Sequence, residues 1–300
     1  MKYGISLNVH ETLQDIMDKS REIERLGFHY IWVADTPSQR YAPIVASAIA
    51  ESTKRVKIGI GVLSPFLYSE REIANAVKTL IEFYGERFEV CLGPGDPDQL
   101  RRVGISLLKL RDIPMRILES KRKIEEEFDR SGLNVPIWIG AQGPRMLKIS
   151  KFFQGVLLNY AHPELVRWAT DVIKTSGGHV KLGVYASAYV YSEEEEEVKQ
   201  LLRMAASTVV LGLSKNVLEK LGFHEEVENA RVKLKEGLPP EDISRFLPEE
   251  LLEKFIIHMP TTKLKEYLSA LKSIGIEHLV FGFPQNFSKK NIRVLAEALF

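Results

Sequence analysis

The stretch at residues 56–95, VKIGIGVLSPFLYSEREIANAVKTLIEFYGERFEVCLGPG, carries the pattern that decides the fold. It begins with an apolar, β-branched run, Val56–Leu63, and ends with a second apolar run, Phe88–Leu92. Between the runs, apolar residues recur at the spacing of one helix face: Ile73, Val77, Leu80, Ile81 and Tyr84. Gly85 stands where such a helix ends. The stretch is therefore predicted to fold as strand, helix and strand, the repeating unit of a parallel sheet.

The same alternation continues along the whole chain. Eight short apolar runs are predicted as strands: Tyr3–Val9, Tyr30–Ala34, Val56–Leu63, Phe88–Leu92, Pro136–Gly140, Gly155–Asn159, Val180–Val190 and His278–Gly282. Several are apolar almost throughout, which indicates burial on both faces of a sheet. Eight strands, each followed by a helix, favour a closed α/β barrel of the (β/α)8 or TIM type over an open doubly wound sheet. We expect residues 1–300 to form one such domain.

The regular alternation is interrupted between the seventh and eighth runs, at about residues 211–260. This segment is predicted to hold extra helices at Lys215–Leu221 and Pro248–His258, with turns at Gly237, Pro239 and Pro240. We interpret it as an insertion on the active face of the barrel that acts as a lid. A linker between two independent domains is the alternative.

Composition excludes several classes of function. The 41 Lys and Arg against 40 Asp and Glu leave a net charge of +1, without the basic excess that nucleic-acid binding requires. No apolar run reaches the ~18 residues of a membrane helix, and no signal peptide opens the chain. Cys91 is alone and cannot form an intramolecular disulfide. We expect a cytoplasmic protein that binds neither nucleic acid nor membranes, with a charge composition typical of heat-adapted sources.

Familiar catalytic and metal-binding motifs are absent. His10-Glu11 begins like a zinc-protease motif, but the second histidine would fall at Gln14. Gly93-Pro94-Gly95-Asp96 lacks the third glycine of a dinucleotide fingerprint, and neither a Walker lysine nor a nucleophile-elbow serine is present. The seven histidines do not have metal-ligand spacing, so no metal site is predicted.

Polar side chains stand at the carboxyl ends of the first two predicted strands. Ser6, Asn8 and His10 follow the first strand, and Asp35 follows the second. Because barrel strands converge at one mouth, where active sites lie, these residues are candidates for contact with a ligand. The alternative is structural: small polar residues cap loops, and Asp35 is in place to cap the helix ahead of it.

The next three strands end in glycine. Gly59 and Gly61 interrupt the third strand, which suggests a bulge or a close approach of backbone to a flat ligand. The fourth ends in Gly93-Pro94-Gly95-Asp96, with one carboxylate. The fifth ends in Gly140-Ala141-Gln142-Gly143 just before a helix, where main-chain amides can bind phosphate. Barrel packing and plain turns are the alternatives.

These strand ends together resemble the bacterial luciferase-like superfamily. The matching residues are Gly61-Val62, Gly93 to Asp96, Ile139 to Pro144 and Gly155 to Asn159. Within the superfamily, the chain is similar over essentially its whole length to the coenzyme F420-dependent methylenetetrahydromethanopterin reductases. This similarity includes Tyr185 to Tyr189 and Ile276 to Gly282.

The resemblance implies a barrel that binds coenzyme F420 at its mouth, moves a hydride between the deazaflavin ring and a carbon substrate, and forms a homodimer. It also implies a cis peptide bond between Gly61 and Val62 behind the ring, and a phosphate-bearing tail along Gly140 to Gly143. The residues it implies for coenzyme binding are Gly61, Val62, Gly93, Gly95, Gly140, Ala141, Gln142, Gly143 and Asn159. It places Asp35 and Asp96 near the ring, and together with Ser6 at the end of the first strand they are the candidate catalytic residues.

The chain also departs from the reductase pattern. Ser6 stands where the reductases have an acid, Thr36 stands where they have a histidine, and the segment at about residues 121–135 is shorter. A serine alone does not replace a carboxylate as acid or base. Two alternatives therefore stay open: an FMN-dependent monooxygenase of the same superfamily, and a coenzyme-binding protein without turnover.

Overall fold

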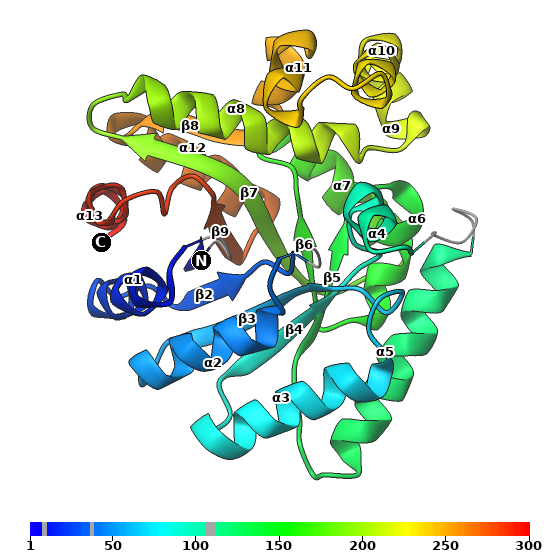
Figure 1. Ribbon diagram of the computed structural model, residues 1–300, viewed down its shortest axis with the longest axis vertical. Coiled ribbons are helices and arrows are strands. Elements are labelled where there is room, and N and C mark those ends of the chain that lie inside the picture. The colour runs from blue at the N-terminus through cyan, green and yellow to red at the C-terminus, as the bar shows by residue number, and fades with distance from the viewer. Residues whose placement is uncertain (8–10, 37–38, 106–111) are drawn as a thin grey trace.

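The computed structural model describes residues 1–7, 11–36, 39–105 and 112–300, and within them the strands form one nine-stranded sheet (Figure 1). The strands are β1 (Lys2–Leu7), β2 (Tyr30–Val33), β3 (Lys57–Leu63), β4 (Phe88–Leu92), β5 (Ile137–Ala141), β6 (Gly155–Leu158), β7 (Lys181–Tyr191), β8 (Ile256–Pro260) and β9 (His278–Gly282). Every pairing between them is parallel.

Helices connect the strands and surround the sheet (Figure 1). They are α1 (Leu13–Arg25), α2 (Ala42–Ser52), α3 (Glu70–Tyr84), α4 (Pro97–Arg102), α5 (Ile113–Asp129), α6 (Pro144–Ile149), α7 (Pro163–Thr175), α8 (Glu196–Leu211), α9 (Lys215–Leu221), α10 (His224–Lys235), α11 (Glu249–Glu253), α12 (Thr261–Ile274) and α13 (Lys289–Leu299), with 3₁₀ turns η1 (Ser150–Phe152) and η2 (Pro240–Phe246). Helix α3 shows why they begin where they do. Ser69 accepts from the Glu72 amide, and the Glu72 carboxylate accepts from the Ser69 amide, a capping box.

Eight of the strands close into a barrel. Strands β1 to β6 follow one another, β7 pairs with both β6 and β9, and β9 returns to β1. The predicted (β/α)8 barrel is therefore confirmed, and an open doubly wound sheet is wrong.

Strand β8, the one outside the closed barrel, corrects one expectation. The stretch Pro248–His258 was predicted to be a helix, but only Glu249–Glu253 is helical, and β8 begins at Ile256. Strand β7 continues beyond its pairing with β9, and its end, Ser187–Tyr191, pairs with β8. The exposed edge of this end of β7 offers main-chain hydrogen bonds to another strand. The β-branched residues Ile256 and Ile257 therefore form a strand that extends the sheet, and they do not continue the helix.

The barrel interior is filled by large side chains set against glycine. A Cβ on Gly59 would lie 2.3 Å from the Trp32 ring, and one on Gly155 would lie 2.3 Å from the Trp138 ring. The Trp32 indole donates to His278 Nε2 at 2.9 Å, and the Trp138 indole donates to Glu89 Oε2 at 2.7 Å. At Gly59, therefore, barrel packing accounts for the glycine.

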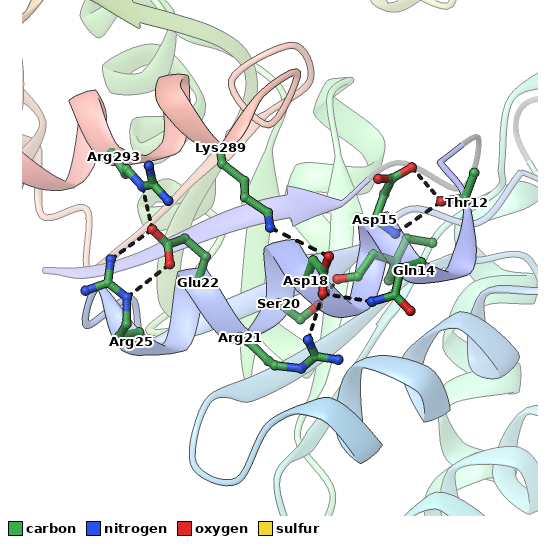
Figure 2. A network of polar contacts seen from close by, with 11 residues as sticks. Thr12, Gln14, Asp15, Asp18, Ser20, Arg21, Glu22, Arg25, Lys289 and Arg293 are labelled. Atoms are coloured by element: carbon green, nitrogen blue, oxygen red, sulfur yellow. Dashed lines mark hydrogen bonds and ion pairs between the residues drawn. The ribbon is translucent and has the colours of Figure 1, made fainter.

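Helices α1 and α13 are tied together by an ion-pair network between the two ends of the chain (Figure 2). Glu22 accepts from Arg25 at 2.8 Å and from Arg293 at 2.6 Å, and Lys289 lies 3.7 Å from Asp18. The network fastens the last helix to the first beside the strands that close the barrel.

The expected insertion, at about residues 211–260, contains α9, α10, η2, α11 and β8, and Figure 1 shows α9, α10 and α11 gathered beyond α8 on one side of the barrel. In the described residues, a single helix with the length and apolar character needed to cross a bilayer is not found. Helices α8 and α9 together meet these criteria as a pair bent by 118°.

Candidate active site

The third strand carries the irregularity expected of it. The Gly61–Val62 peptide bond is cis, as predicted, and the pairing of β3 with β4 shifts register between Ile60 and Leu63. Gly61 has a φ of +155°, and a Cβ at this position would lie 2.5 Å from the carbonyl oxygen of Cys91. Only glycine fits both the conformation and the close approach of β4.

Val62 brings the ends of β3, β4 and β5 together. A Cβ on Gly93 would lie 2.3 Å from Val62 Cγ1, and a Cβ on Gly140 would lie 3.4 Å from Val62 Cγ2. Three of the residues predicted to bind the coenzyme are therefore neighbours. They form a surface of main chain and one small side chain, on which a flat ligand can rest.

The loop after β4 is anchored to the end of β3. The Ser64 hydroxyl donates to the Pro94 carbonyl at 2.8 Å, and a Cβ on Gly95 would lie 3.3 Å from Ser64 Cβ. Asp96 follows, partly exposed, and its carbonyl accepts from the Leu100 amide of α4 at 3.0 Å. Ser64 was not predicted as part of the site. Its signal is only a serine directly after a strand.

The loop after β5 is held from the end of β6. The buried Tyr160 hydroxyl donates to the Gln142 carbonyl, while Ala141 is buried and Asn159 is partly exposed. The structure thus brings the Gly140 to Gly143 loop next to the strand that ends in Asn159. The tyrosine that fixes the loop was missed, because its contact is visible only after folding.

The insertion reaches this same loop. The Ser214 hydroxyl, between α8 and α9, lies 3.6 Å from where a Cβ on Gly143 would be. Arg231 of α10 holds that turn by donating to the carbonyls of Leu211 at 2.7 Å and Leu213 at 2.6 Å. The insertion therefore lies at the mouth of the barrel, and its action as a lid stays a prediction.

Asp35, at the end of β2, is held by two hydrogen bonds. Its Oδ1 accepts from the Ala42 amide at the start of α2 at 3.1 Å, and its Oδ2 accepts from the Tyr68 hydroxyl at 3.0 Å. Burial raises the pKa of the Asp35 carboxyl, whereas these two bonds lower it. Burial and the Asp35 charge together raise the pKa of Tyr68. The structural alternative, an aspartate that caps the next helix, accounts for the bond from Ala42 but not for the bond from Tyr68.

Ser6 meets a partner that was not predicted as catalytic. Its hydroxyl is hydrogen-bonded to the hydroxyl of Tyr185, from β7, and Ser6 itself is 4% exposed. Burial raises the pKa of Tyr185 to about 12. The Tyr185 ring packs against an interior cluster that includes Cys91. Cys91 belongs to β4 and lies against Gly61, so the Ser6–Tyr185 pair lies beside β4.

Asn8 and His10 lie outside the described residues. In the parts of the chain that are described, His, Cys, Asp and Glu do not gather in groups of three that would hold a metal ion. A surface hollow lies along α5, away from the glycine-rich strand ends, and is lined by Asp112, Met115, Arg116, Leu118, Glu119 and Arg122.

The structure is a parallel (β/α)8 barrel with a bulged third strand and glycine-rich ends on strands three to five, an architecture that the chain shares with luciferase-like proteins. Consistent with this, residues 1–119 match the family model described as luciferase-like monooxygenase.

Individual relatives extend the similarity over the whole chain. The chain is 27% identical to the 5,10-methylenetetrahydromethanopterin reductase of Archaeoglobus fulgidus over 320 residues, which cover 97% of this chain and 96% of the relative. It is 24% identical to the F420-dependent glucose-6-phosphate dehydrogenase of Amycolatopsis mediterranei, over 95% of this chain and 92% of the relative. The solved structure of the coenzyme F420-dependent tetrahydromethanopterin reductase from Methanopyrus kandleri superimposes with a TM-score of 0.82 and 22% identity, covering 99% and 97% of the two chains.

Proposed function

We propose that this chain is a coenzyme F420-dependent oxidoreductase that transfers a hydride between the deazaflavin ring and a small carbon substrate. The observation that carries the proposal is the contact surface of Val62 with Gly93 and Gly140 at the barrel mouth. Full-length similarity to methylenetetrahydromethanopterin reductases and F420-dependent glucose-6-phosphate dehydrogenases supports it.

The residues at the mouth fit a flat ring with an anionic tail. Gly61, Val62, Gly93 and Gly140 offer main chain and one short side chain to a ring, and a bulkier residue at Gly93 or Gly140 would meet Val62. When bound, coenzyme F420 supplies or accepts the hydride. The protein orients the ring and excludes water.

We assign the tail to the loop after β5. Gly140, Ala141, Gln142 and Gly143 precede α6, where main-chain amides can face an anion, and a Cβ at Gly143 would lie 3.6 Å from Ser214 Oγ. Gly95 shapes the loop that carries Asp96, and Asn159 ends the neighbouring strand.

We assign chemical roles to Ser6, Asp35 and Asp96 at the same mouth. The two hydrogen bonds of Asp35 make it a positioning residue for the start of α2 and for Tyr68. Asp96 follows the loop that Ser64 anchors, and we propose that its carboxylate lies beside the bound ring.

An FMN-dependent monooxygenase is the second candidate, because the matching family model is described as luciferase-like monooxygenase. The test is an equilibrium titration of the purified protein with F420, reduced F420, FMN and nicotinamide coenzymes, followed by a hydride-transfer assay with the coenzyme that binds. F420 binding with hydride transfer to methylenetetrahydromethanopterin, a ketone or an aldehyde supports the first candidate. FMN binding with oxygen consumption supports the second, and binding without turnover on any substrate supports a non-catalytic carrier.

We further propose that residues 1–300 act as one domain in a cytoplasmic homodimer. Exposed apolar side chains on neighbouring helices α2 and α3, Ile44 at 70% and Phe83 at 66% exposure, are consistent with a second copy covering that side. Sedimentation equilibrium tests the homodimer, which predicts twice the mass of 34.1 kDa.

A further inference from the structure

Two hydroxyl groups from distant strands meet inside the barrel near its mouth. Ser6 lies on β1 and Tyr185 on β7, and strand β9 lies between them in the sheet. The Tyr185 ring passes over Gly282 of β9, where a Cβ would lie 3.2 Å from Tyr185 Cε2. Glycine on the intervening strand therefore lets the phenol reach Ser6.

The Ser6 and Tyr185 hydroxyls together carry one proton more than the hydrogen bond between them needs. Each hydroxyl carries a single O–H, and one O–H···O bond between them consumes one of the two protons. Among the described residues, neither hydroxyl makes a second hydrogen bond. In the described part of the chain, one O–H is therefore left without a protein acceptor. Because Tyr185 is partly exposed, a ligand atom at the mouth can be that acceptor.

Tyr185 is the better placed of the two to meet that ligand. Ser6 is 4% exposed, whereas Tyr185 is partly exposed. Either hydroxyl can donate in the bond between them; when the Ser6 hydroxyl donates to the phenol oxygen, the phenol proton is free for a ligand. The Ser6 hydrogen bond lowers the pKa of Tyr185 against the effect of burial, as expected of a donor that stabilises the phenolate.

We propose that Tyr185, supported by Ser6, is the proton donor of the reaction, and that the atom it protonates is the oxygen of a ketone or aldehyde substrate. This inference rests on the proposed function. In the direction of reduction, the C=O π bond breaks, the carbonyl carbon gains a C–H bond from the hydride of the reduced deazaflavin, and the oxygen takes the phenol proton. The carbonyl compound is reduced to an alcohol and the deazaflavin is oxidised. The phenolate keeps the Ser6 hydrogen bond and regains its proton from water.

The acidity of the donor agrees with an oxygen acceptor. Tyr185, with a pKa of about 12, is a stronger acid than water, which is ionised only at about 15.7. Proton transfer to an alkoxide, a base close in strength to hydroxide, is therefore downhill. The phenol thus suits a carbonyl oxygen.

The experiment compares wild type, Tyr185→Phe and Ser6→Ala with the matched control Tyr30→Phe. Tyr30 is another phenol of the barrel interior, and its hydroxyl donates to Glu89 at 3.0 Å. Each protein is titrated with F420 and assayed with reduced F420 against acetone, cyclohexanone and methylenetetrahydromethanopterin. Thermal unfolding is recorded for all four proteins, so that a misfolded variant is recognised.

We expect wild type and Tyr30→Phe to reduce a ketone. Tyr185→Phe should lower kcat by about 10²- to 10⁴-fold, the usual contribution of a general acid, at unchanged F420 affinity. Ser6→Ala should lower kcat by about tenfold at unchanged KM, because one neutral hydrogen bond to the phenolate is lost. A solvent deuterium isotope effect on kcat should be present in wild type and absent in Tyr185→Phe.

A second readout does not depend on turnover. The ¹³Cζ resonance of Tyr185, identified by its absence in Tyr185→Phe, should move when cyclohexanone is added to the F420 complex. A shift on addition of F420 alone assigns the phenol to the coenzyme and overturns the inference. F420 binding without turnover of either ketone also overturns it and leaves the proposed function standing, whereas failure to bind F420 refutes the proposed function itself.

Discussion

The Val62 side chain of β3 lies directly against the main chain of β4 at Gly93, so that a Cβ on Gly93 would stand 2.3 Å from Val62 Cγ1. Valine has a stiff, branched side chain and cannot turn aside as a flexible one would. The two residues therefore depend on each other, and the surface they form with Gly140 exists only while position 93 lacks a side chain.

Gly93→Ala should consequently destabilise the protein by about 1–3 kcal/mol, the usual range for overpacking, and weaken F420 binding at least tenfold. Urea unfolding and a fluorescence titration measure the two effects. The double variant Val62→Ala, Gly93→Ala should recover most of the stability, because the overlapping methyl group is gone. Equal destabilisation in single and double variants would show that the contact is not the cause.

Tyr160→Phe should weaken F420 binding by about tenfold while costing about 1 kcal/mol of stability, because the Gln142 carbonyl loses its donor and the loop after β5 loses its anchor. Tyr267→Phe is the matched control. It also removes a hydroxyl that donates to a main-chain carbonyl, that of Ala161 at 2.8 Å, away from the glycine-rich loop. Similar binding losses in both variants would argue against a specific role of the loop.

Acid should destabilise the fold through His278. Burial lowers the pKa of this histidine to about 3, against 6.5 in an unfolded chain, so the unfolded state takes up a proton that the folded state refuses. The stability that depends on this difference is complete above about pH 6.5 and is lost as the pH falls below it, by up to about 1.4 kcal/mol per unit. In His278→Gln the loss between pH 6.5 and 4.5 should be smaller, whereas the exposed control His162→Gln should behave as wild type. Urea unfolding across this pH range measures it.

The ion-pair network between α1 and α13 should lose its stabilising effect at a lower pH than the one at which His278 acts. The hydrogen bonds from Arg25 and Arg293 lower the pKa of Glu22 from 4.5 to about 2. Because the folded pKa is the lower one, the stabilisation is present above about pH 4.5 and is lost as the pH falls towards 2. Glu22→Gln should cost about 1 kcal/mol at pH 7, since both arginines are exposed and solvent screens the pairs, and much less at pH 2. The exposed control Glu266→Gln should be neutral at both.

The barrel itself was predictable because a strand that is buried on both faces is apolar along most of its length. Runs such as Ile58–Leu63 are apolar on both faces, which only a sheet covered on both sides explains. Strand β8 was not predictable, because five residues of strand and five of helix look alike in an apolar segment. Its conformation is decided by the free edge of β7, a partner distant in the sequence.

The candidate site was predictable where glycine is required and unpredictable where side chains meet across the barrel. Gly61, Gly93 and Gly140 mark places where main chain approaches main chain, and the structure brings them together at Val62. The bonds of Tyr185 to Ser6 and of Tyr160 to Gln142 join positions 179 and 18 residues apart, so no local pattern reveals them.

The central claim is that the ends of β3, β4 and β5 bind a deazaflavin, and a competition titration of F420 against FMN on wild type and Gly140→Leu tests it most directly. A Cβ at position 140 already lies 3.4 Å from Val62, so a leucine there fills the space above the strand ends. We predict that F420 binds wild type, that FMN does not displace it, and that Gly140→Leu folds but no longer binds. Tight FMN binding without F420 binding, or full F420 affinity in Gly140→Leu, would contradict the account.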